Sequence, residues 1–400
     1  MTNHPPTSTA ARPSAAKLAL YGLVPVVLLV ALLFVLVRTG ALRALHGDAP
    51  PVEIVSVERL TLDDHGMTLQ VLNDGPDPVR IAQVMVDDAY WQFTQEPAGE
   101  LGRLGRATLR IPYPWVDGEA HEVVMVSATG VTFAHEIPVA VATPRPNARL
   151  VSLFALVGLY VGVLPIALGL LWYPLVRTIS QGALDFVLAL TVGLLLFLLV
   201  DTAHEGLEVA SGIASSYQGV ALFTFCAIFA FAAVEVLGAW LRGRRQQVSA
   251  AWVTALLVAI GIGLHNFGEG LAIGTAVRLG EISLGTLLIV GFMLHNTTEG
   301  LAIVAPLSKE PLRIGRLLGL GLVAGAPTIP GAWLGGFLYS GFWSAVFLAI
   351  AAGAIAQVVV EITRGVVAGR PLADLVRSAP VVAGLAAGFG VMYLTGMWIG

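Results

Sequence analysis

Two nearly identical hexads contain residues that could hold a metal ion, His-Asn-Phe-Gly-Glu-Gly from residue 265 and His-Asn-Thr-Thr-Glu-Gly from residue 295. Histidine and glutamate are four residues apart in each, so on a helix they lie one above the other, about 5–6 Å apart at Cβ. Imidazole and carboxylate ligands suit zinc, iron and neighbouring ions, and the lack of a thiolate argues against copper(I). The candidate metal ligands are His265, Asn266, Glu269, His295, Asn296 and Glu299.

Two weaker patterns could continue a metal path on either side of the hexads. Asp201, His204 and Glu205 fall in a third copy of the [His/Asp]-x-x-x-Glu-Gly-Leu pattern. We expect them on the entry path to the site, with a direct ligand role or a solvated helix mouth as the alternatives. Gln357 and Glu361 are again four residues apart, which predicts either an exit path or a glutamate that reaches the membrane surface.

Composition indicates a membrane protein. Of 400 residues, 56% are hydrophobic and only 12% are charged, whereas soluble domains have about 25% charged residues. A carboxylate at the bilayer centre costs roughly 2.5–3.5 kcal/mol, so each one needs a partner or a function. The net charge of -4 and the lack of a basic aromatic patch argue against a nucleic-acid partner.

The chain divides into four segments by composition. A polar tail (1–17) precedes an apolar run (18–38) that predicts an uncleaved membrane anchor, with a cleaved signal peptide as the alternative. Alternating apolar residues and turn signals over 51–146 predict an antiparallel β-sandwich. The remainder (150–400) predicts eight spans, near 150–175, 183–206, 217–241, 251–277, 283–306, 316–340, 342–363 and 378–399.

Loop charges predict the orientation of these spans. Alternate loops carry the basic residues, while the intervening loops carry Arg278 alone, so the positive-inside rule places the basic loops in the cytoplasm. Nine spans result, with a cytoplasmic N-terminus and an extracytoplasmic β-domain and C-terminus. The two hexad helices then run antiparallel, which brings the histidine of each level with the glutamate of the other. Richness in alanine, glycine and arginine favours a bacterial cytoplasmic membrane.

The paired hexads on consecutive spans resemble the signature of the ZIP (Zrt/Irt-like) family of metal transporters, and FLAIAAGAIAQVVVEITRG in a later span resembles another family segment. The resemblance covers 150–400. It implies an all-α eight-helix bundle, a homodimer, a binuclear site on the six hexad residues, and uptake of zinc first, with iron, manganese, cadmium or cobalt as other candidates. The family usually has proline before the glutamate, where this chain has Gly268 and Thr298.

Two other functions are compatible with the same residues. An intramembrane metal-dependent hydrolase is one, but no second histidine stands four residues after His204, and we do not expect an enzyme. A metal sensor without transport is the other. The β-domain histidines His65, His121 and His135 could collect metal or simply be surface residues, and the sequence does not identify a partner of that domain.

Overall fold

The computed structural model describes residues 15–39, 50–243, 249–278, 282–311, 313–338, 340–367, 370, 371, 374 and 377–399. Most of the predicted polar tail (1–14) and the loop residues Arg43, Arg244 and Arg245 lie outside the described residues. The chain forms two compact units, Met1–Val52 and Glu53–Gly400.

The first unit contains one helix, α1 (Ala15–Arg38), which has Pro25 inside it. Its apolar side chains between Leu20 and Leu36 are largely exposed. A helix that is apolar on all sides and exposed suits a lipid environment. The predicted anchor is therefore helical, and its segment Leu23–Leu36 is a short apolar helix.

The β domain consists of two antiparallel four-stranded sheets with the strand orders β1-β2-β6-β5 and β4-β3-β7-β8. One cluster of buried side chains, including Leu69 and Leu109 from one sheet and Val84 and Met125 from the other, lies between them. The predicted period-2 stretches form β2, β3, β6, β7 and β8. The strands are β1 (Val55–Asp63), β2 (Gly66–Asn73), β3 (Ile81–Val86), β4 (Ala89–Trp91), β5 (Thr94–Glu96), β6 (Arg106–Ile111), β7 (His121–Ser127) and β8 (Thr132–Ile137).

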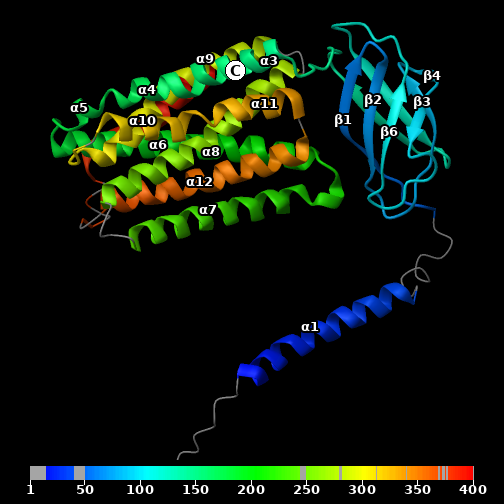
Figure 1. Cartoon of the computed structure of the whole chain (residues 1–400), viewed down its shortest axis with the longest axis horizontal. Helices are drawn as coiled ribbons and strands as arrows, with labels where there is room; N and C mark the ends of the chain where they lie inside the picture. The colour runs from blue at the N-terminus through cyan, green and yellow to red at the C-terminus, as the bar shows by residue number, and fades with distance from the viewer. Residues whose placement is uncertain are drawn as a thin grey trace, which may run out of the picture. The chain divides into compact units, whose positions relative to one another are not determined.

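The helical bundle follows the β domain, and its long helices run alongside one another (Figure 1). Asn147 and Ser180 cap the first turns of α3 and α6 through their side-chain oxygens. The helices are α3 (Ala148–Gly158), η1 (Leu159–Val163), α4 (Leu164–Leu170), α5 (Tyr173–Val176), α6 (Gln181–Gly212), η2 (Ser215–Tyr217), α7 (Gly219–Gly243), α8 (Ala250–Arg278), α9 (Ile282–Val304), η3 (Ala305–Leu307), α10 (Ile314–Gly325), α11 (Thr328–Leu338), α12 (Gly341–Val367) and α14 (Ala379–Ile399).

Seven helices in the described part of the chain are long and apolar enough to cross a membrane, and they begin at Ala148, Gln181, Ser215, Ala250, Leu288, Ile314 and Gly341. A shorter apolar helix, Ala379–Leu394, lies where the last span was predicted. The protein is thus mostly helical, with two small antiparallel sheets, and its apolar helices indicate an integral membrane protein.

The β domain contacts one end of the bundle through charged groups at helix ends. The turn after β2 presents Asp74, whose carboxylate accepts hydrogen bonds from the backbone N–H groups of Ser215 (2.6 Å) and Ser216 (2.7 Å) at the start of η2. Arg59 of β1 donates to the carbonyl of Phe337, in the last turn of α11, at 3.4 Å. The first N–H groups and the last C=O groups of a helix lack partners within the helix. Asp74 pairs with such N–H groups at the start of η2, and Arg59 pairs with such a C=O group at the end of α11.

A second contact joins the same end of the bundle to β1 and β6. The carboxylate of Glu58 accepts from Tyr217 Oη at 2.8 Å and from Arg106 Nε at 2.8 Å. We call this end of the bundle the β-domain end, and the end where α7 finishes at Gly243 and α8 begins at Ala250 the far end.

Replacement of Asp74 tests this docking. Burial raises the pKa of Asp74, but the hydrogen bonds from Ser216 and Ser215 outweigh it and hold the pKa below its ordinary value of 3.8. A depressed pKa means that docking is strongest above pH 3.8 and is lost as the pH falls through the lower folded value. In Asp74→Asn, hydrogen exchange at the amides of Ser215 and Ser216 should be about tenfold faster or more at neutral pH, since bonds to a charged group are lost.

Asp117→Asn, in an exposed turn of the same domain, is the matched control and should leave the exchange at residues 215 and 216 unchanged. Equal exchange in Asp74→Asn and the unaltered protein would show that this carboxylate does not hold the two parts together.

Candidate metal centre

The two hexads lie within α8 and α9, which pack against each other. All six candidate ligands are at most 7% exposed. Buried polar groups at this depth require partners. The contacts of each side chain therefore show which of its atoms already have a partner and which are available to a cation. The six side chains are His265, Asn266, Glu269, His295, Asn296 and Glu299.

Glu269 links the two helices. Its Oε1 contacts Nε2 of His295 across the helix pair and lies 3.2 Å from Nε2 of His265 on its own helix. Its Oε2 accepts a hydrogen bond from Nδ2 of Asn296 at 2.8 Å. The expected antiparallel register, with the histidine of one helix level with the glutamate of the other, is present for this pair.

The two asparagines are oriented by carbonyls on neighbouring helices. Asn296 donates to Val161 O at 3.0 Å and Asn266 donates to Ala324 O at 3.0 Å. Pro165 lacks the N–H that would pair with Val161 in an α-helix, and Ala324 lies in the last turn of α10, just before Pro327. Both amide nitrogens are used in these bonds, whereas both amide oxygens are buried without a partner among the described residues.

Glu299 has neither carboxylate oxygen in a hydrogen bond with any described residue, although both oxygens are buried. Its ligand atom and those of His265 and His295 lie within 4.8 Å of one another. Glu299 Oε1 and Oε2 and the two asparagine oxygens have no hydrogen-bond partner among the described residues, and His265 Nε2 lies 3.2 Å from Glu269 Oε1 without a hydrogen bond. All these atoms can offer lone pairs. The converging ligand atoms of His265, His295 and Glu299 fit a cation.

A cavity of about 270 Å³ connects this cluster to α6. Asp201 and Glu205 line it from α6, together with His265, Glu269 and His295. Thr202, in the same turn of α6, is buried and has its hydroxyl 3.4 Å from His265 Nδ1. His204 is exposed and does not line this cavity. The structure therefore brings Asp201 and Glu205 to the centre and leaves His204 apart.

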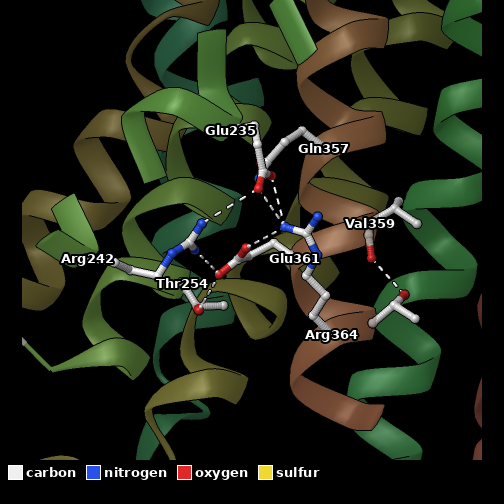
Figure 2. Close-up of polar contacts among 8 residues, drawn as sticks. Glu235, Arg242, Thr254, Gln357, Val359, Glu361 and Arg364 are labelled. Atoms are coloured by element: carbon white, nitrogen blue, oxygen red, sulfur yellow. Dashed lines mark hydrogen bonds and ion pairs between the residues drawn. The ribbon is translucent and has the colours of Figure 1, made fainter. Parts of the chain in front are cut away.

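Gln357 and Glu361 lie in a separate network near the far end (Figure 2). Glu361 Oε1 accepts from Arg242 Nη1 at 2.7 Å, while Gln357 Nε2 donates to Glu235 at 3.1 Å. Neither Thr202 nor the arginines that bind Glu361 and Glu235 were predicted from the sequence as part of the path. Arg242 is seven residues after Glu235 and Arg364 is three after Glu361, so helical spacing alone could have placed each pair on one face.

Glycines let α8 approach its neighbours closely. A Cβ at Gly270 would lie 2.1 Å from Thr328 O of α11, and one at Gly331 of α11 would lie 2.1 Å from Phe267 O. Small residues permit close helix contact here. By contrast, Gly268, at the position of the family's proline, has space for a Cβ, with Leu348 Cδ2 the nearest atom at 3.5 Å.

No protein-family model matches this chain, and a search of curated proteins gives no match.

Alanine substitutions at Gly270 and Gly268 form a matched pair on one helix. Gly270→Ala should force α8 and α11 apart and cost about 1–3 kcal/mol, seen as a lower unfolding temperature of the purified protein in detergent. Gly268→Ala should leave that temperature unchanged or raise it, because alanine favours helix over glycine by about 1 kcal/mol. Similar losses in both variants would contradict the contacts described.

Proposed function

We propose that this protein carries divalent transition-metal ions across the membrane into the cytoplasm, in the manner of ZIP-family transporters. The observation that supports this most is the convergence of His265, His295 and Glu299 in the interior of an apolar helical bundle, with the Glu269 carboxylate in contact with both imidazoles. Glu269 and Glu299 together carry the two negative charges that balance a divalent cation.

The ligand types favour an exchangeable ion. Imidazole and carboxylate oxygen bind zinc, iron, manganese, cadmium and cobalt, with zinc first among them. Thiolate ligands, which hold zinc in closed structural sites, do not occur in the cluster, since its members are histidine, glutamate and asparagine. We infer that the ion is cargo that passes through and not a permanent structural part.

Polar groups of two other helices could continue the path. Asp201 and Glu205 of α6 line the cavity of the centre, and Gln357 and Glu361 lie in the half of α12 that is nearer the far end. An ion could thus exchange ligands stepwise, from the α6 carboxylates to the hexads and then to α12. His204 has no part in this path.

The direction of transport follows from the distribution of charge. The described basic residues of the far-end connections, among them Arg242, Arg313 and Arg364, favour placing that end in the cytoplasm. We propose nine spans in a bacterial cytoplasmic membrane, comprising the anchor and an eight-helix ZIP-like bundle, with the N-terminus inside and the β domain outside. We also propose that the protein is a homodimer.

Uptake of a radioactive metal by a metal-starved host tests the transport role. His265→Ala and Glu299→Ala should each lower zinc uptake at least about tenfold, because loss even of groups that only orient metal ligands costs 10–100-fold. His204→Ala is the matched control, since it removes an exposed histidine of the same bundle, and should transport as well as the unaltered protein.

Three outcomes would point elsewhere. Uptake unchanged in both variants would exclude the hexads as the transport site. Zinc binding without any uptake by the unaltered protein would favour a sensor. Hydrolysis of a lipid or peptide by the purified protein, lost in the same variants, would favour an intramembrane enzyme.

A further inference from the structure

Six side chains near the far end form a network that joins α7, α8 and α12 (Figure 2). Arg242 Nη1 (2.7 Å) and Thr254 Oγ1 (3.1 Å) both donate to Oε1 of Glu361. Arg364 Nη1 donates to both oxygens of Glu235, at 2.8 and 2.9 Å, and Gln357 Nε2 donates to Oε2 at 3.1 Å. Each carboxylate thus has a principal arginine partner.

Two oxygens of this network have no hydrogen-bond partner among the described residues. They are Gln357 Oε1 and Glu361 Oε2, and both are buried. Gln357 is fully buried and Glu361 is 8% exposed, and the two lie one helical turn apart on the same face of α12. Arg364 Nη1 lies 3.9 Å from Glu361 Oε2, without hydrogen-bond geometry.

Gln357 offers an amide oxygen without a partner, and Glu361, one helical turn away, offers one carboxylate oxygen without a partner. Together they form an incomplete ligand set for a cation. Gln357 Oε1 and Glu361 Oε2 are available, and Glu361 Oε1, the third oxygen, is covered by Arg242 and Thr254. Oxygen ligands of this kind bind divalent cations. Arg242 therefore occupies an oxygen of Glu361 that a divalent ion held by this carboxylate could also use.

Charge explains why an ion and the arginine would exclude each other. Glu235 and Glu361 carry two negative charges, which Arg242 and Arg364 neutralise. A divalent cation added to this neutral group would be repelled by two guanidiniums at short range in a site of low dielectric. The side chain of Arg242 comes from the last turn of α7 and is 26% exposed, so it can withdraw toward the far end of the bundle.

We propose that Arg242 is a resident counter-ion for Glu361 that the departing metal ion replaces. The site thereby alternates between an arginine-bound state and a state in which a divalent cation is held by Glu361 and Gln357. In the first state the exit is closed by the Arg242 contact, as in this structure, and in the second the ion lies one step from the cytoplasm. This inference rests on the proposed transport function.

Zinc binding to the purified full-length protein in detergent tests the inference. Arg242→Gln keeps a polar side chain at this position, although a shorter one, and removes its charge. This variant should bind one more zinc ion per chain than the unaltered protein, or bind that ion with a dissociation constant at least about tenfold lower. The additional binding should disappear in the double variant Arg242→Gln/Glu361→Gln, whereas Arg242→Lys should bind zinc as the unaltered protein does.

Arg364→Gln is the matched control, because it removes a guanidinium that bonds Glu235 and leaves Glu361 Oε1 covered. Its gain in zinc affinity should be clearly smaller than that of Arg242→Gln. Equal gains in the two variants would show a general effect of charge and overturn the specific role of Arg242. No gain in a folded Arg242→Gln protein would overturn it as well.

Failure of this inference is distinguishable from failure of the transport proposal. If the unaltered protein takes up zinc through the hexads but Arg242→Gln binds no further ion, only the role of Arg242 falls. If uptake does not depend on His265 and Glu299, the transport proposal falls whatever Arg242→Gln binds.

Discussion

The carboxylate of Glu269 is buried in the interior of the bundle, and its partners set the arrangement of the helices around it. A buried charge is tolerated only where several polar groups surround it. Here they come from both hexads, through His265 on its own helix and through His295 and Asn296 on α9. Asn296 is in turn fixed by Val161 O, so the position of Glu269 depends on the broken helix α3–α4 as well.

The proline that usually precedes the glutamate in the ZIP-family motif is absent from both hexads, but prolines interrupt the neighbouring helices. Pro165 and Pro327 interrupt the helices that pack beside α9 and α8 and leave carbonyls near the breaks for the two asparagines. These carbonyls fix the orientation of both asparagine side chains. The consequence is that kinks in neighbouring helices orient the ligands, while α8 itself runs as one helix from Ala250 to Arg278.

The charged groups of the bundle fall into two kinds. Near the far end, Asp185 is bound by Arg370 at 2.6 Å and Glu235 by Arg364 at 2.8 Å, so each of these carboxylates has a cationic partner in the protein. In the centre, Glu299 has no hydrogen bond to any described residue. This contrast favours a ligand role for Glu299, since a carboxylate kept for structure alone would be expected to have such a partner.

Much of this arrangement could be predicted from the sequence, because helical spacing is local. The i,i+4 pairs of the hexads and the period-2 strands such as Gly66–Asn73 follow from the chain itself. Contacts between distant segments could not be predicted in this way. Asp74 meets Ser215 across 141 residues and Arg242 meets Glu361 across 119, and only the packed structure brings such pairs together.

X-ray absorption spectroscopy on the zinc-loaded protein would examine the metal centre most directly, because it reports which atoms surround the ion. We expect nitrogen and oxygen ligands at about 2.0–2.2 Å, including imidazole, and no sulfur. The imidazole contribution should fall in His295→Ala and persist in His204→Ala. A spectrum with sulfur ligands, or one without imidazole in the unaltered protein, would contradict a zinc site formed by the two hexads.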